Sequence, residues 1–350
     1  MSQTMPNASV PNASAPNATA PNTPAADADG EAQATRDARS WRSIVANYAI
    51  VWVVLALFIG LSLTTDGFLT LANIKNVLDQ QSLLLVAASL ATITMIAGGF
   101  DVSQGALFVI APLAAIQIQR ATGSVPIAIV GGVGVGMLIG AINGFLVAVV
   151  RINSFIATLA VSTMLFGLGY VVSGSAILRP SSPDAWAVLS RTTILGLTSA
   201  TWIAAVVVVI SWFVLARTTF GRYVYAVGAN AEAARLAGVR TLLIIGSTFA
   251  LSGGAAALAG VMNSSRSLSS TPSDDVSFVF AVIAAIVVGG TSIAGGEGTI
   301  WRTIFGAFFI ALLGNGFNLH QIDPIFQRIV QGAVILGAVS IDSWARSRRA

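Results

Sequence analysis

Asp101 is the only acidic residue between Asp79 and Asp184, and apolar sequence lies on both sides of it. It stands in the segment AGGFDVSQGALF, Ala97 to Phe108. An ionisable group at membrane depth is costly and usually serves a function. Its carboxylate could couple proton movement to transport, or it could cap the helix that begins near Ser103 by accepting backbone N–H groups. We favour the capping role and keep proton coupling as the alternative.

A second segment of similar form, VGGTSIAGGEGTIW, runs from Val288 to Trp301. Each segment has a Gly-Gly pair, a few polar residues and a further glycine between two apolar stretches. Backbone at membrane depth leaves the helix only where protein or a water-filled cavity satisfies its polar groups, and interrupted helices in both halves of a chain point to a transport pathway. We therefore predict a first and a second break, with ordinary tight turns as the alternative. The residues assigned to the breaks are Gly98, Gly99, Asp101, Ser103, Gly105, Gly289 and Gly290.

A basic segment, TTFGRYVYAVGANAEAARLAGVR, runs from Thr218 to Arg240. It is the only long polar, basic segment between two hydrophobic stretches, and its one acid is Glu232. The pattern of Asn230 to Val239 predicts a short helix that ends at Gly238. Because basic loops stay on the cytoplasmic side of a membrane, we expect this segment to face the cytoplasm and to dock a soluble partner.

Composition excludes several classes of function. Of 350 residues, 55% are hydrophobic and 9% charged, against about 25% charged in soluble domains. The chain has no cysteine and one histidine, so thiolate metal sites and thiol nucleophiles are excluded, and we expect no metal and no cofactor. Its only lysine, Lys75, stands in NIKN, so the chain lacks a P-loop for ATP. The net charge of +4 comes from arginines that follow membrane topology, and no nucleic-acid partner is expected.

The hydropathy pattern predicts an all-α polytopic membrane protein of about ten transmembrane helices, interrupted by the glycine-rich breaks. The arginine excess falls on the connections that hold Arg151, the basic segment and Arg302, which places both termini in the cytoplasm. The predicted spans lie near residues 44–63, 77–97, 104–119, 126–149, 155–173, 200–216, 242–262, 278–293, 303–319 and 325–341.

The N-terminal tail, residues 1–40, has a different composition from the transmembrane domain expected over residues 41–345. The motifs PNASV, PNASA, PNATA and PNTPA repeat from Pro6, and such residues cannot bury enough apolar area to offset chain entropy, so we expect a disordered tail. The tail contains three N-x-[ST] sequons. The arginines just before the first span favour a cytosolic tail, and in a cytosolic tail the sequons have no role.

The segments AGGFDVSQGA, INGFLVAVVRINSFIATLA, TTFGRYVYAVGANAEAARLAGV, AAIVVGGTSIAGGEGTI and LLGNGFNL together resemble the inner-membrane permease of ribose-type sugar ABC importers. The resemblance covers about residues 45 to 342. It implies a homodimer in membrane lipid, cytoplasmic ABC ATPase subunits, and a periplasmic or extracellular sugar-binding protein. It also implies that the basic segment is the coupling region for the ATPase, through Gly221, Arg222, Tyr225, Gly228, Asn230, Ala233, Ala234, Arg235 and Gly238.

The chain departs from the pattern of this family at three places. Gln104 puts an amide where an apolar residue is usual, and Gly167 stands where an arginine is usual. Val279, Phe280 and Ala281 replace an acidic stretch before the second break. Losing the charges at the last two places removes polar contacts on the outer half, so the departures bear on the substrate and the matching binding protein rather than on the fold.

We therefore expect a permease subunit, without enzymatic activity of its own, that moves a pentose or hexose across the bacterial inner membrane. The amides of Asn143, Asn315 and Asn318 are candidates for the substrate path, because amides both donate and accept hydrogen bonds. They could equally bond between helices. The alternatives are an ion-coupled secondary transporter that uses Asp101, and a channel or structural membrane subunit.

Overall fold

The computed structural model describes residues 49–323, 325–327, 329–330, 332–334, 336–337 and 340. The N-terminal tail lies outside the described residues, and so does part of the tenth predicted span, 325–341. The described helices and strands belong to one compact unit, Ile50–Ala350, apart from the first residue of the first helix. Each of the other nine predicted spans contains a helix, with boundaries that shift by a few residues.

Seven helices within the described residues are long and apolar enough to cross a membrane, which agrees with an all-α polytopic membrane protein but does not confirm the predicted count of about ten. These seven are α3 (Leu71–Ile96), α4 (Gln104–Thr122), α5 (Val125–Ala148), α6 (Ser154–Ser173), α8 (Ser199–Arg217), α11 (Thr241–Ser267) and α13 (Ile300–Leu319). Two further apolar helices are shorter, α2 (Ala49–Thr64) and α12 (Ser277–Val288). A span needs about 20 residues, so α12 alone reaches only part of the way through a bilayer.

Several elements between the spans were not predicted. Helix α7 (Pro183–Arg191) buries Trp186 and is followed by an antiparallel hairpin of β1 (Thr193–Ile194) and β2 (Leu197–Thr198). The two turn residues, Leu195 and Gly196, both have positive φ, as a type I′ hairpin requires. Apart from this hairpin and an isolated antiparallel bridge between Leu178 and Ser270, the described secondary structure is helical. The two-residue strands of the hairpin are too short to leave an alternating pattern.

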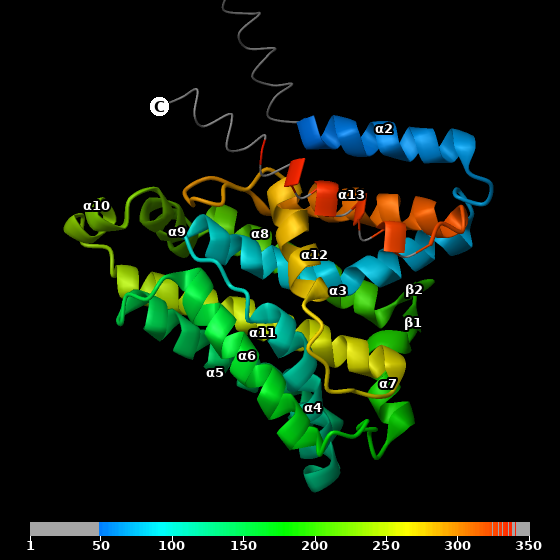
Figure 1. Ribbon diagram of the computed structural model, residues 1–350, viewed down its shortest axis with the longest axis horizontal. Helices are drawn as coiled ribbons and strands as arrows, with labels where there is room; N and C mark the ends of the chain where they lie inside the picture. Colours follow the sequence, from blue (N-terminus) through cyan, green and yellow to red (C-terminus); the bar gives the residue numbers. More distant parts are fainter. Residues whose placement is uncertain are drawn as a thin grey trace, which may run out of the picture. The chain divides into compact units, whose positions relative to one another are not determined.

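Helix α11 packs against α3, α4 and α5. Figure 1 shows α9 (Thr219–Ala229) and α10 (Ala231–Leu236) near one end of α11, and α7 with the hairpin near its other end. Glycines let α5 and α11 approach: a Cβ on Gly140 would lie 2.2 Å from the carbonyl oxygen of Phe249. Small residues at such contacts allow close packing where lipid supplies no hydrophobic driving force.

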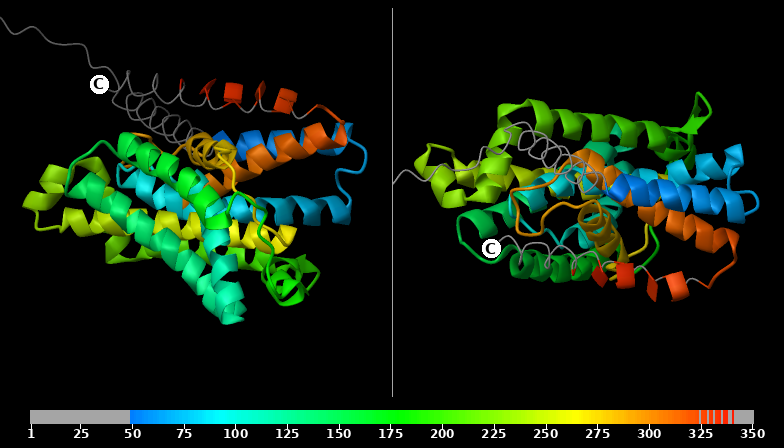
Figure 2. Two further views of the ribbon diagram at one scale, coloured as in Figure 1. Left: turned by 60° about the horizontal axis from the view of Figure 1, so that its bottom comes forward. Right: turned by 90° about the horizontal axis from the view of Figure 1, so that it is seen from above.

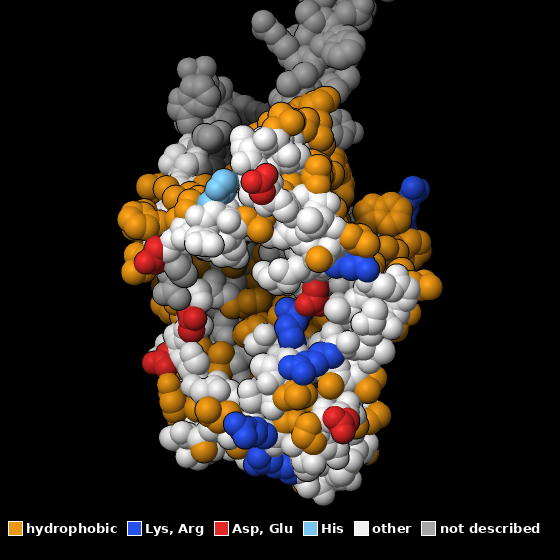
Figure 3. Space-filling model, turned by 90° about the vertical axis from the view of Figure 1, so that its right-hand side faces the viewer, with side chains coloured by type: hydrophobic (Ala, Val, Ile, Leu, Met, Phe, Trp, Pro, Cys, Tyr) orange, Lys and Arg blue, Asp and Glu red, His pale blue; other side chains and the backbone are white. Residues whose placement is uncertain are grey.

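Helices α2 and α13 lie side by side in both views of Figure 2. Val54 of α2 and Leu312 of α13 form one buried cluster with Phe68. Charged side chains are spread over the face that Figure 3 shows, at the α7 end, while hydrophobic side chains lie mainly along its flanks. This distribution is the one expected of a chain whose flanks meet lipid.

Candidate functional site

The first and second breaks, far apart in the sequence, pack against each other. The N–H of Gly296 donates a hydrogen bond to the carbonyl oxygen of Ile96, the last residue of α3, at 2.8 Å. A Cβ on Gly295 would lie 2.9 Å from the Cα of Gly98, and both glycines have positive φ. Glycine is needed here because two backbones meet where a side chain would not fit.

Helix α9 of the basic segment packs against this junction of the two breaks. A Cβ on Gly228 would lie 1.8 Å from the carbonyl oxygen of Ile96 and 2.6 Å from the nitrogen of Gly296. The hydroxyl of Tyr225 donates to the carbonyl oxygen of Gly298 at 2.7 Å. Two residues of the predicted coupling region, Tyr225 and Gly228, therefore contact the second break, and Gly228 also meets Ile96, which directly precedes the first break.

Helix α10 begins and ends where the sequence predicts a short helix. The side chain of Asn230 accepts the N–H of Ala233 at 2.9 Å, and Gly238 follows the helix with a φ of +86°. Asn230 is therefore the N-cap of α10, and Gly238 is the left-handed residue that follows its C-terminus. Helix α9 was not predicted, although buried Val224 and Val227 stand at helical spacing. Because α9 contains aromatic and β-branched residues, this helical spacing was not recognised from the sequence.

The charged side chains of the basic segment are exposed. Arg235 donates to both carboxylate oxygens of Glu232, with Nε 3.0 Å from Oε2. These hydrogen bonds lower the pKa of Glu232 below its usual value. The side chains are 61% and 65% exposed, so the pair adds little stability. Arg222 is also exposed, and its side chain has no hydrogen-bond partner within the described part of the chain.

Asp101 organises the polar residues at the start of α4. Its Oδ1 accepts the backbone N–H of Ser103 at 3.0 Å and the hydroxyl of Ser103 at 2.6 Å. Its Oδ2 accepts the hydroxyl of Ser252 at 2.6 Å. Ser252 lies 11 residues after Thr241, the first residue of α11, which corresponds to about 16 Å along the helix. The carboxylate therefore lies well inside the bundle, and it satisfies a backbone donor at a helix start.

Asn143 and Gln104 extend this cluster. The amide of Asn143 donates to the hydroxyl of Ser103 at 2.8 Å, and the amide of Gln104 donates to that of Ser252 at 2.6 Å. Both amides are completely buried. Asp101 and Gln104 line a cavity of about 10 Å³. Asn143, a sequence-based candidate for the substrate path, lies within the Asp101 cluster.

The other two predicted path amides, Asn315 and Asn318, lie on α13. Asn315 and Asn73 of α3 exchange two hydrogen bonds of 3.0 and 2.8 Å, so this amide joins two helices. The oxygen of Asn318 accepts from Gln327 at 2.8 Å. Both residues line a cavity of about 290 Å³ that Asn143 does not reach. The three amides are therefore not brought together at one place.

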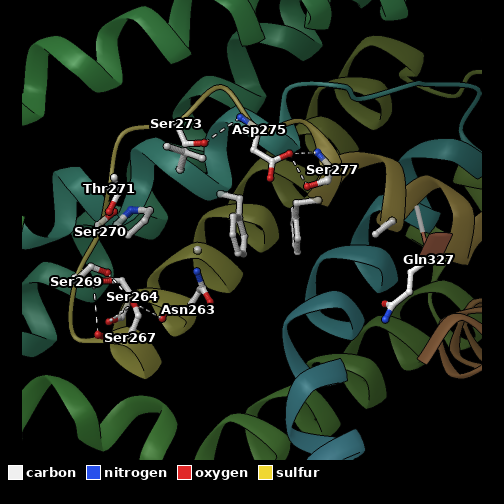
Figure 4. Close-up of a pocket in the computed structure, with 16 residues that line it drawn as sticks. Asn263, Ser264, Ser267, Ser269, Ser270, Thr271, Ser273, Asp275, Ser277 and Gln327 are labelled. Atoms are coloured by element: carbon white, nitrogen blue, oxygen red, sulfur yellow. Dashed lines mark hydrogen bonds between the residues drawn. The ribbon is translucent and has the colours of Figure 1, made fainter. Parts of the chain in front are cut away.

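A large pocket lies elsewhere in the described structure and involves none of the predicted site residues. It has a volume of about 710 Å³ and lies between α4, α11, the segment 268–276 and α12 (Figure 4). Ser, Thr and Asn side chains dominate its lining. The sequence signal was the run NSSRSLSSTPSDDVS, Asn263 to Ser277, which connects the predicted spans 242–262 and 278–293 and was assigned no function.

A bundle of apolar helices in which two broken segments meet a basic, exposed helix pair defines a membrane transport subunit. The chain belongs to the family described as branched-chain amino acid transport system / permease component, whose profile matches residues 73–339. It is a multi-pass inner-membrane protein and a transport subunit, not an enzyme.

Curated relatives cover most of the chain. The ribose import permease protein of Escherichia coli (strain K12) is 34% identical over 307 residues, which are 86% of this chain and 93% of the relative. The L-arabinose ABC transporter permease protein of Azospirillum brasilense is 34% identical over 307 residues, 87% and 90% of the two chains. The D-allose transport system permease protein of Escherichia coli (strain K12) is 30% identical over 306 residues, 85% and 93%. No solved structure matches the chain.

Proposed function

We propose that this protein is the permease subunit of an ABC importer that carries a monosaccharide across the inner membrane. The observation that supports this most is the packing of α9 on the junction between the end of α3 and the second break, because it links an exposed basic surface to the interior of the bundle. The relatives with high coverage are permeases for ribose, L-arabinose and D-allose. Their names favour a sugar over the branched-chain amino acids of the family description.

Separate ABC ATPase subunits supply the energy in this proposal, since the sequence contains no P-loop. They dock on α9 and α10, at the end of α11 where Arg222 and Arg235 are exposed. That end faces the cytoplasm by the positive-inside rule. A shift of α9 would reach the second break through Tyr225 and Gly228, and the start of the first break through Ile96, which Gly228 meets.

The proposal also covers the topology of the chain, its oligomeric state, its binding-protein partner and the substrate path. The transmembrane domain spans residues 41–345 with about ten helices, both termini lie in the cytoplasm, and residues 1–40 form a separate tail. The importer contains two copies of the permease in lipid, and a sugar-binding protein delivers the substrate from outside. Asn315 and Asn318 contribute to the path through the cavity that they line.

Reconstitution in proteoliposomes tests the proposal. The permease is co-purified with the ABC ATPase and the sugar-binding protein that the proposal assigns to it, and uptake of D-ribose, L-arabinose, D-allose and L-leucine is measured. We expect ATP-dependent uptake of at least one sugar, no uptake of leucine, and no effect of a protonophore. Uptake that runs without ATP and stops with the protonophore would establish the secondary-transporter alternative through Asp101.

A further inference from the structure

The 710 Å³ pocket between α4, α11 and α12 has the lining of a site for a neutral, hydroxyl-rich ligand. We infer that it is a monosaccharide-binding vestibule within each permease subunit, closed at its inner end by a pair of phenylalanines. This inference rests on the proposed function. The volume lies within the range of about 300–1,000 Å³ that is typical of small-molecule sites. Ten of its sixteen lining residues are polar, in a chain that is 55% hydrophobic.

The side-chain amide of Asn263 lines the pocket and is bonded to no described residue. Its side chain makes no hydrogen bond within the described chain and extends from α11 toward the middle of the pocket (Figure 4). The hydroxyls of Ser270 and Thr271 also make no hydrogen bond within the described chain. An amide and hydroxyls can each donate and accept, which is what a sugar hydroxyl needs from its partners.

The charge of the lining argues against an amino acid as the ligand. None of the described lining residues is a lysine or arginine, so a substrate carboxylate would find no cation. The only acid, Asp275, accepts the N–H of Ser277 at 2.8 Å as well as its hydroxyl. Desolvating the carboxylate of an amino-acid ligand without a cationic partner is costly, whereas a neutral polyol needs only hydrogen bonds. The pocket therefore fits a sugar better than a branched-chain amino acid.

The pocket lies at the end of α11 that is remote from the basic segment. Asn263 follows Thr241, the first residue of α11, by 22 residues, which corresponds to about 33 Å along the helix. This distance is comparable to the hydrocarbon thickness of a bilayer, about 30 Å. A pocket that far from α9 and α10 opens on the side from which a binding protein would deliver sugar.

Phe108 of α4 and Phe278 of α12 close the inner end of this pocket. Their rings are stacked, with centroids 3.9 Å apart and planes 20° apart. One helical turn away along the same two helices, Gln104 and Val282 line the small cavity beside Asp101. The stacked rings therefore separate the hydroxyl-lined pocket from the Asp101 cluster, and substrate can pass only when α4 and α12 move apart.

Single cysteines test the site, because the chain has none of its own. Asn263→Cys, Thr271→Cys and the control Thr122→Cys, at the exposed end of α4 outside the pocket, are labelled from outside with a membrane-impermeant maleimide. Free sugar is added without binding protein, so that docking cannot cover the site. At about ten times its dissociation constant, the transported sugar should slow labelling of both pocket cysteines about tenfold. It should leave the Thr122→Cys rate unchanged.

Labelling that no transported sugar slows, protection by L-leucine, or labelling only from the α9–α10 side would overturn the assignment. If the importer takes up none of D-ribose, L-arabinose and D-allose, the proposed function itself fails, which uptake measures separately. The phenylalanine pair is tested at Val282→Cys, which is buried. This cysteine should react only when Phe278→Ala is added, and not with Phe280→Ala, whose side chain is exposed on the same helix. Equal labelling in all three backgrounds would refute the closure.

Discussion

The hydroxyl of Tyr225 lies 2.7 Å from the carbonyl oxygen of Gly298, to which it donates a hydrogen bond. The bond ties α9 to the second break across 73 residues of sequence. Burial raises the pKa of Tyr225 above its usual value, so the hydroxyl remains protonated and available as a donor. A motion of α9 is therefore transmitted to the second break through a directional contact as well as through packing.

Tyr225→Phe removes this bond without changing the ring. A single hydrogen bond contributes about 0.5–1.5 kcal/mol net, so the fold should survive while the link between α9 and the second break weakens. We expect less sugar taken up per ATP hydrolysed in proteoliposomes at unchanged membrane abundance. Tyr223→Phe is the control, because Tyr223 is exposed on the same helix. An unchanged uptake-to-hydrolysis ratio in Tyr225→Phe would show that the bond does not transmit the motion.

Gly228→Ala should disrupt the junction of α9 with both breaks. The added methyl would lie 1.8 Å from the carbonyl oxygen of Ile96, a backbone atom that cannot move away by a change of rotamer. We expect loss of uptake and a lower thermal unfolding midpoint. Gly134→Ala in α5 meets open space and should be neutral or up to about 1 kcal/mol stabilising, because alanine favours helix. Equal melting curves and uptake for both variants would contradict the role of Gly228.

Local chemistry made parts of the fold predictable from sequence. Asn230 and Gly238 mark the ends of α10 because a cap and a left-handed stop leave their own signature. The two breaks were likewise visible as glycine pairs. Their contact was not, since nothing near Gly98 in the sequence indicates that Gly295 packs on it. The pocket around Asn263 was missed for the same reason, because its walls come from three helices and one connecting segment.

Charge reversal on the basic segment tests where the ATPase docks. Arg222→Glu together with Arg235→Glu should abolish sugar-stimulated ATP hydrolysis while the permease still inserts in the membrane. Arg222→Glu alone is the cleaner change, because Arg235 also pairs with Glu232. Arg191→Glu, at the far end beside the hairpin, changes the charge by the same amount as Arg222→Glu and serves as its control. Normal coupling in the double variant would place the docking surface elsewhere.

The titration of Glu232 reports on the pairing within α10. Arg235 holds its pKa below the usual value, so the folded pKa is lower than the unfolded one, which is about 4.3. The stabilisation from the pair is thus present above about pH 4 and is lost as pH falls through the folded pKa. We expect the carboxyl carbon resonance of Glu232 to titrate below the free value and to move back toward it in Arg235→Ala. A midpoint that Arg235→Ala leaves unchanged would mean that the pair is not formed in solution.

Asp101 distinguishes a helix cap from a proton carrier. In Asp101→Asn, the remaining oxygen can still accept the N–H of Ser103, and the new amide can donate to the hydroxyl of Ser252, which has lone pairs for it. Asparagine also caps helices well. We therefore expect near wild-type uptake for Asp101→Asn. Asp184→Asn, on the exposed α7, controls for the loss of a negative charge.

Asp101→Leu should be severe, because the N–H of Ser103 and the hydroxyl of Ser252 both lose a buried acceptor. A buried donor left unpaired costs about 1–3 kcal/mol, so the unfolding midpoint should fall together with uptake. Gln104 and Asn143 would be affected too, since each donates to one of those two serines. The opposite pattern is equally informative. If Asp101→Asn keeps its stability but stops uptake, and a protonophore stops the wild type, then the carboxylate carries protons and the chain works as a secondary transporter.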